Sequence, residues 1–255
     1  MDIFGRTVMI TGASGGLGRA IALELHRQGA KLLLTARRRE LLEALATEVD
    51  ADIIVADLGD PADVERLVER SKEVDVLVLN AGTGGEGNLL ALTPETIDQV
   101  IDVNLRSPIH MATAFAQRHV GAGTEASIVL IGSLSGLVAT PNTQMYNATK
   151  FGLRGFALAA RQDLEGTGVG LTLVAPGFIR DAGMFHDNDV TLPSVVRTKS
   201  PADVAHAVVR AIRTNPGEIY VSPTELRLVA TLGSLAPGIS ERIQRRIDTK
   251  TMSGG

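Results

Sequence analysis

A tyrosine and a lysine four residues apart, Tyr146 and Lys150, are the side chains of this sequence whose types and spacing most directly suggest chemistry. On a helix that spacing puts both on one face, so an ammonium can lie beside a phenol. Free tyrosine has a pKa of about 10, and a neighbouring cation favours its phenolate form. The pair is therefore suited to proton transfer near neutral pH, although alone it could also be an ordinary pair on a helix surface.

Two further polar residues stand at defined places in the chain. Ser133 comes thirteen residues before Tyr146 and directly follows the apolar run 126–132, so its hydroxyl is expected at the end of a buried strand. Asn104 lies in a segment with helical character. Taken singly, the serine could be an ordinary strand-end hydroxyl, and the asparagine could satisfy buried backbone groups.

The elements that must position these side chains alternate between strand and helix. Short runs rich in Val, Ile and Leu recur, each followed by a segment with helical periodicity. Because the runs are apolar nearly throughout, they are expected to be parallel strands covered by helices on both faces. The predicted fold class is α/β, a doubly wound seven-stranded parallel sheet with right-handed crossovers. The predicted strands are 7–11, 31–35, 52–56, 75–79, 126–132, 170–175 and 218–222.

No Pro/Ser-rich linker or charge block divides the 255 residues, so a single domain spanning 1–255 is predicted. The stretch 177–200 has no clear element, and long loops of compact domains are often lids. It follows the sixth strand, at the carboxyl edge where ligands bind in open α/β sheets. We therefore expect a substrate lid at about 177–200 and a helical tail at about 224–250.

A glycine-rich loop joins the first strand to a helix predicted at 19–28. Glycine lets a backbone turn tightly and approach a pyrophosphate, whose charge a helix N-terminus favours. The strict G-x-G-x-x-G spacing is absent, and the plainer alternative is an ordinary strand-to-helix turn. The place of the loop between a strand and an amphipathic helix predicts dinucleotide binding. The expected contacts are Gly12, Ser14, Gly15, Gly16, Leu17 and Gly18.

Arginines follow the second strand. Ala36 stands where NAD-binding folds carry an acidic residue for the ribose hydroxyls, and Arg37, Arg38 and Arg39 come next. Cations at a helix start oppose the macrodipole, so a ligand phosphate explains them better than solvation alone. Because arginine suits a 2′-phosphate, the sequence predicts NADP rather than NAD, with Arg37 and Arg38 as contacts.

Composition excludes several classes of function. The net charge of −4, from 25 Lys and Arg against 29 Asp and Glu, leaves no basic excess for nucleic acid. The absence of cysteine rules out disulfides and thiolate zinc sites, and the five histidines lack metal-ligand spacing, so no metal is expected. We find no signal-peptide pattern and no run of roughly 20 apolar residues. A soluble, cytoplasmic protein is expected.

In their order and context these residues resemble the short-chain dehydrogenase/reductase family, in its compact single-domain branch. A larger epimerase and dehydratase branch shares the spacing of Gly12, Gly15 and Gly18, but the roughly thirty residues after the seventh strand leave no room for its extra domain. The motifs that carry the resemblance are Thr11-Gly12-x-x-x-Gly16-x-Gly18, Asp57-Leu58, Asn80-Ala81-Gly82, Asn104, Ser133, Tyr146 with Lys150, and Pro176-Gly177.

The resemblance implies a Rossmann-type NAD(P)-binding domain and reversible hydride transfer between the nicotinamide of NADP and a carbonyl or secondary alcohol. Tyr146 would exchange the substrate proton, and Ser133 would polarise the carbonyl oxygen. Lys150 would favour the phenolate and bind the nicotinamide ribose, while Asn104 would hold a water linking Lys150 to solvent. The further cofactor contacts implied are Asp57, Leu58, Asn80, Ala81, Gly82, Tyr146, Lys150, Pro176, Gly177 and Ile179.

The alternative to an enzyme is a noncatalytic NADP-binding sensor or regulatory protein on the same fold, which should lack one of the four active-site residues. All four are present. One departure from the family pattern is Asp181, where a threonine commonly contacts the cofactor, so Ile179 is expected to act only through its backbone. The expected pocket walls are mostly apolar, which favours a hydrophobic ketone or alcohol. They are Leu134, Leu137, Val138, the loop 83–87, Met184, Phe185 and His186.

The helix after Tyr146 has a broad apolar surface, with Phe151 and Leu158 extending a main stripe. The resemblance implies that this helix pairs with its symmetry mate in a homodimer or homotetramer; a helix buried within one subunit is the alternative. The tail pairs isoleucines with arginines, which favours packing on a partner or over the active-site mouth, with a membrane surface as the alternative. The stripe is Leu153, Phe156, Ala157, Ala160 and Leu164, and the tail residues are Ile239, Ile243, Ile247, Arg242, Arg245 and Arg246.

Overall fold

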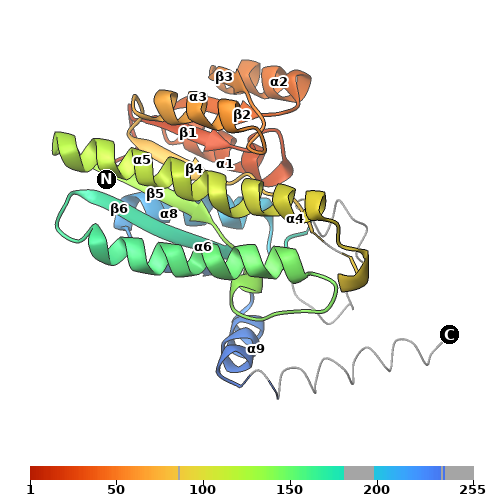
Figure 1. The fold of residues 1–255 in the computed structure, drawn as a ribbon. Coiled ribbons are helices and arrows are strands. Elements are labelled where there is room, and N and C mark those ends of the chain that lie inside the picture. Colours follow the sequence, from red (N-terminus) through yellow and green to blue (C-terminus); the bar gives the residue numbers. More distant parts are fainter. Residues whose placement is uncertain (86, 181–197, 237, 239–255) are drawn as a thin grey trace.

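The computed structural model describes residues 1–85, 87–180, 198–236 and 238. In this part of the chain, one parallel sheet has the strand order β3-β2-β1-β4-β5-β6-β7, with helices on both faces (Figure 1). The predicted fold class is confirmed, and every predicted strand end lies within one residue of the observed one. The strands are β1 (Thr7–Thr11), β2 (Lys31–Ala36), β3 (Asp52–Val55), β4 (Val76–Leu79), β5 (Ala126–Ile131), β6 (Val169–Pro176) and β7 (Glu218–Val221).

Two helical layers cover the sheet. Successive strand residues face opposite layers: Val8 and Ile10 of β1 pack into one apolar core, whereas Met9 between them packs into the other. The first layer holds α1 (Gly16–Arg27), α2 (Arg39–Val49) and α8 (Pro201–Thr214). The second holds α3 (Pro61–Ser71), α5 (Ser107–Ala122) and α6 (Gln144–Asp163). Before α5 come the 3-10 turn η1 (Leu89–Ala91), helix α4 (Pro94–Ile101) and the π-helical turn η2 (Asp102–Arg106).

Helix starts in this fold differ in a way that bears on ligand binding. Helix α3 begins with the Asp60 side chain accepting from a backbone N–H, and α8 begins with a capping box between Ser200 and Asp203. Helix α1 has no side-chain hydrogen bond at its N-cap, Gly15. It also begins at Gly16, three residues before the predicted start, because close packing offsets the poor helix propensity of its glycines.

The strand order reverses between β1 and β4. From β1 the chain moves outward to β2 and β3, then returns to place β4 on the other side of β1. Ligands bind at such a switch point, outside the carboxyl ends of the strands. Thr11, the last residue of β1, ties the two ends together because its hydroxyl oxygen accepts hydrogen bonds from the backbone N–H groups of Asn80 and Ala81, both at 3.0 Å.

Helix α9 (Thr224–Leu235) stands apart from the two layers and projects from the body of the molecule (Figure 1). Its inner side packs through Ala230 on Leu134 and Leu137. Most of the expected lid and about half of the expected tail, including Ile239, Ile243 and Ile247, lie outside the described residues. These two predictions and the single-domain assignment therefore stay predictions. The outer side of α9 exposes Leu228, Val229, Leu232 and Leu235.

Candidate active site

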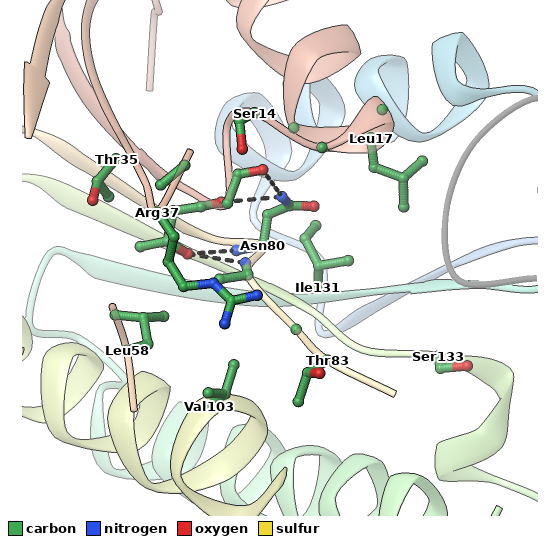
Figure 2. A pocket seen from close by; sticks show the side chains of 18 of the residues that line it. Ser14, Leu17, Thr35, Arg37, Leu58, Asn80, Thr83, Val103, Ile131 and Ser133 are labelled. Atoms are coloured by element: carbon green, nitrogen blue, oxygen red, sulfur yellow. Dashed lines mark hydrogen bonds between the residues drawn. The ribbon is translucent and has the colours of Figure 1, made fainter. Parts of the chain in front are cut away.

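A cleft of about 350 Å³ opens at the carboxyl ends of the central strands (Figure 2). It is lined by every residue predicted to bind cofactor and by three of the four predicted catalytic residues; Asn104 is the exception. The lining residues are Thr11, Gly12, Ser14, Gly15, Gly16, Leu17, Gly18, Thr35, Ala36, Arg37, Arg38, Ala56, Asp57, Leu58, Asn80, Ala81, Gly82, Thr83, Val103, Ile131, Gly132, Ser133, Tyr146, Lys150, Pro176, Gly177 and Ile179.

The glycine-rich loop, residues 11–18, is shaped by two glycines that leave no room for a side chain. Gly12 has a φ of +67°, and a Cβ there would lie 2.8 Å from the Cα of Ala81. A Cβ on Gly18 would lie 2.2 Å from the Gly12 carbonyl oxygen. The first glycine therefore permits the turn between β1 and α1, and the last lets the first turn of α1 pack on the strand end.

The amino end of helix α1 opens onto this cleft. Its first backbone N–H groups have no partner within the helix, and no side chain caps them at Gly15. A helix N-terminus of this kind attracts an anion through its free N–H groups and the helix dipole. Arg38 braces the loop, since its Nη2 donates to the Ser14 carbonyl oxygen at 2.8 Å and its Nε donates to the Ser14 hydroxyl at 3.3 Å.

Arg37 reaches into the cleft from the end of β2, as Figure 2 shows. Its Nη1 lies 3.8 Å from an oxygen of Asp57, and the two side chains are 60% and 46% exposed. An ion pair at that distance and exposure holds its partners weakly. The guanidinium is therefore available to a phosphate at this end of the cleft.

Lys150 is buried at the opposite end. Its ammonium donates to the Ile131 carbonyl oxygen at 3.0 Å and lies 5.6 Å from the centroid of the Tyr146 ring. Burial disfavours the charged form and lowers the pKa of Lys150 to about 8. The structure thus brings the ammonium beside the phenol, as the four-residue spacing predicts.

Ser133 stands just beyond β5, in a turn that packs against helix α6. The Ser133 turn, residues 133–138, contains the 3-10 helix η3 (Leu134–Gly136). The Ser133 hydroxyl oxygen accepts from the N–H of Ser135 at 3.0 Å. A Cβ on Gly136 would lie 2.7 Å from the Lys150 carbonyl oxygen, so only glycine lets the turn lie this close to the helix.

Asn104 is buried beside the cleft, within the π-helical turn η2. Its Oδ1 accepts from the N–H of Thr83 at 2.8 Å, and its Nδ2 donates to the Thr83 carbonyl at 2.9 Å and to the Thr149 hydroxyl at 3.4 Å. The side chain therefore holds the loop after β4 and does not line the cleft. Gly82 leaves open the space between Asn104 and Lys150, because its Cβ would lie 3.4 Å from Oδ1 and 3.8 Å from Nζ.

The expected walls of a substrate pocket are only partly placed. Leu134 and Leu137 are each 6% exposed and pack under helix α9 instead of lining the cleft. Gly177 packs closely here, since its Cβ would lie 3.0 Å from side-chain atoms of Leu134 and Ser222. Asp181, Met184, Phe185 and His186 lie outside the described residues.

Several lining residues were not among the predicted cofactor contacts, although Thr83 belongs to the loop 83–87 that was expected as a pocket wall. All but Val103, which lies in η2, sit at or just beyond the carboxyl ends of β1 to β5, so the shared edge of one parallel sheet is the signal that could have found them. These residues are Thr11, Thr35, Ala36, Ala56, Thr83, Val103, Ile131 and Gly132.

Within the described residues, no group of three or more His, Cys, Asp or Glu side chains is placed to hold a metal ion. None of the helices within the described ranges combines the length and the apolar character that a membrane crossing requires.

Comparisons with known proteins connect the cleft to one family. The family model described as short chain dehydrogenase matches residues 6–191. The ketoacyl reductase HetN of Nostoc sp. is 30% identical over 94% of this chain and 88% of its own length.

Two solved structures share the fold over nearly their whole length. A short-chain dehydrogenase from Sphingobium yanoikuyae in complex with NADPH is 28% identical, covers 92% of this chain and 95% of its own, and has a TM-score of 0.78. The bulky-bulky ketone specific alcohol dehydrogenase from Comamonas testosteroni is 25% identical, covers 98% of this chain and 94% of its own, and has a TM-score of 0.77.

Proposed function

The chain belongs to the short-chain dehydrogenase/reductase family, and from this premise we propose that it is an NADP-dependent oxidoreductase of hydrophobic ketones or secondary alcohols. Family membership makes it an oxidoreductase acting on CH–OH and C=O groups with a nicotinamide nucleotide. The preference for NADP, the hydrophobic substrate and the roles of individual residues are the proposal.

The shape of the glycine-rich loop supports binding of the nucleotide. Gly12 and Gly18 form a cradle that a Cβ would fill, and the uncapped start of α1 suits the pyrophosphate. Arg37 and Arg38, at the end of β2, would hold the 2′-phosphate that distinguishes NADP from NAD. When bound, the nicotinamide supplies or accepts the hydride.

The chain's own residues would handle the proton. Ser133 would donate a hydrogen bond to the carbonyl oxygen and stabilise the charge that develops on it. Tyr146 would give its phenolic proton to that oxygen in reduction and take the alcohol proton in oxidation. With a pKa of about 8, Lys150 is mostly protonated at neutral pH, so its positive charge favours the phenolate.

Asn104 would act by shaping the space beside Lys150. Its side chain fixes the backbone of Thr83, and the space left by Gly82 separates it from the ammonium of Lys150. That space is where a water linking the ammonium to solvent would lie. Reprotonation of Tyr146 through Lys150 would use this route.

A hydrophobic substrate is supported by the charges along the cleft. Among the described lining residues the cations are Arg37, Arg38 and Lys150. The arginines lie at the glycine-rich loop, and the lysine is buried beneath Tyr146, so none is offered to a substrate phosphate or carboxylate at Ser133. The relatives named above include a ketoacyl reductase and an enzyme specific for bulky ketones.

The observation that carries the proposal is that Ser133, Tyr146 and Lys150 line the same cleft as the glycine-rich loop. We predict that the protein oxidises NADPH with hydrophobic ketones and that Tyr146→Phe lowers kcat by roughly 100- to 10,000-fold, since the general acid is lost. Absorbance at the NADPH band measures the rate, and fluorescence titration should show that the variant still binds NADPH. Equal rates in parent and variant, or activity confined to acidic or phosphorylated carbonyls, would contradict the proposal.

A further inference from the structure

Asn147, the residue after Tyr146, points away from the proton-transfer pair and into the Ser133 turn. It is only 5% exposed. Its Nδ2 donates to the carbonyl oxygen of Ser135 at 3.2 Å and to that of Val138 at 3.1 Å. One amide of helix α6 therefore holds two backbone groups of the turn that follows β5.

The orientation of this amide follows from its neighbours. Two carbonyl oxygens can only accept, so the nitrogen of Asn147 must face them. Its Oδ1 then faces the hydroxyl of Thr143, one helical turn earlier, and this hydroxyl also lies 2.9 Å from the Thr140 carbonyl oxygen. The Thr140 hydroxyl lies 2.7 Å from the Thr143 oxygen and can donate to it in turn. Every polar atom of the Asn147 side chain is engaged.

The turn that Asn147 holds has few other fixed points at its carbonyl groups. The N–H of Gly136 donates to the Ser133 carbonyl oxygen, and the N–H of Leu137 donates to that of Leu134. The carbonyl oxygens of Ser135 and Val138 both accept from Asn147. Without the amide these two carbonyl oxygens lose this partner at a partly buried site. The position of the Ser133 turn against α6 would then rest on the close Gly136 contact and on the hydrogen bond from Lys150 to the Ile131 carbonyl, just before the turn.

We propose that Asn147 is a positioning residue: it fixes the Ser133 turn against helix α6 and so sets where the Ser133 hydroxyl stands relative to Tyr146. This inference rests on the function proposed above, because it gives Ser133 a part in holding the substrate carbonyl.

Kinetics on three variants test the proposal. Asn147→Ala removes both donors and should lower kcat/KM for a ketone by about 100-fold, the scale of loss when a reacting group is misplaced by about 1 Å. The Kd for NADPH should stay that of the parent, because the glycine-rich loop and Arg37 are untouched. Thr143→Val should cost less than Asn147→Ala, since it leaves the Nδ2 donors of Asn147 on both carbonyls and the Thr143 hydroxyl also has the Thr140 carbonyl as a partner.

Asn147→Asp gives a second readout that a loss of stability alone would not produce. The new carboxyl is ionised at high pH and then faces two carbonyl oxygens, whereas at low pH it is protonated and regains one donor. Burial raises the pKa of such a carboxyl by up to about 3–5 units from about 3.9, so its kcat/KM relative to the parent should rise as the pH falls from about 8 to about 6. The matched control is Asn215→Asp at the far edge of the sheet, where the side chain accepts from Arg161 and should show no such trend.

Hydrogen exchange separates this proposal from the proposed function. Exchange at the amides of 134–138 should speed up in Asn147→Ala, while exchange at 12–18 stays unchanged, and this needs no substrate. If the parent reduces no ketone but exchange at 134–138 still speeds up in Asn147→Ala, the proposed function fails and the role of Asn147 in holding the Ser133 turn stands. Three results would overturn the positioning role: unchanged exchange at 134–138 in Asn147→Ala, a loss of NADPH affinity in that variant as large as its loss of kcat/KM, or a relative kcat/KM of Asn147→Asp that does not change with pH.

Discussion

The arginines after β2 carry the proposed choice of nucleotide. Arg37 lines the cleft and is held only weakly by Asp57, whereas Arg39 pairs with Glu43 one turn along α2 and does not line it. A charge-assisted hydrogen bond contributes roughly 1.5–3 kcal/mol, which corresponds to an affinity change of about 10- to 100-fold. The two arginines therefore form a matched pair for testing the nucleotide preference.

We predict that Arg37→Ala weakens NADPH binding by about 10- to 100-fold and leaves NADH binding unchanged. Fluorescence titration of both nucleotides measures this. Arg39→Ala should bind both as the parent does. An equal loss for NADPH and NADH would show that Arg37 does not contact the 2′-phosphate.

Lys150 links the chemistry of the cleft to the stability of the fold. Its pKa is about 8 in the folded protein against an ordinary value of 10.5. Between these values the unfolded chain binds the extra proton, so the parent becomes more stable as the pH rises through this window. Below about pH 8 the buried charge opposes folding in full.

Lys150→Met should remove this pH dependence. From pH 7 to pH 9.5 the free energy of unfolding of the parent should rise by about 2 kcal/mol relative to the variant, because the parent sheds its buried charge. Urea unfolding at the two pH values measures the difference. Lys31→Met, at an exposed lysine, is the control and should follow the parent. If the free energy of unfolding changes with pH equally in the parent and in Lys150→Met, the buried lysine carries no charge that opposes folding.

At the scale of elements, periodicity predicted the strands well and the special helix segments poorly. Strand β5 is apolar throughout because it is covered on both faces, and this is visible in its residues. Helix α1 begins at Gly16 rather than at the predicted residue 19. Glycines at 16 and 18 have poor helix propensity, but the close packing of Gly18 on Gly12 offsets it. The π-helical turn around Asn104 has no counterpart among the predicted elements, and the hydrogen bonds of its asparagine to Thr83 join segments far apart in the sequence.

Helices α6 and α9 each carry apolar side chains on an outer surface that no other part of the described chain covers. On α6, Phe151 is 42% exposed among the exposed small residues Ala148, Gly155 and Ala159. On α9, the face opposite Ala230 carries exposed leucines. The whole expected stripe packs against the core of the subunit itself, so the apolar outer face of α6 is narrower than its sequence suggests. Leu153 and Ala157 are buried there, and Phe156, Ala160 and Leu164 are partly buried.

At the scale of the whole molecule, we predict a homodimer or homotetramer that pairs through helix α6. Phe151→Glu should shift the protein to a smaller species, because a carboxylate in an apolar interface is left without a partner. Sedimentation equilibrium measures the change. Leu41→Glu, which alters a comparably exposed apolar residue on α2, is the control. A monomeric parent would contradict the prediction.

The sequence by itself determined the parallel sheet, the glycine-rich loop and the pairing of Tyr146 with Lys150, because each depends on periodicity or on spacing within one element. Only the tertiary structure decided how groups from different elements meet. It showed that Asn104 faces Thr83 rather than the cleft, that Leu134 and Leu137 pack beneath α9, and that Asn147 reaches the Ser133 turn. These contacts join residues by packing across strands and helices, and that information is absent from any local pattern of residue types.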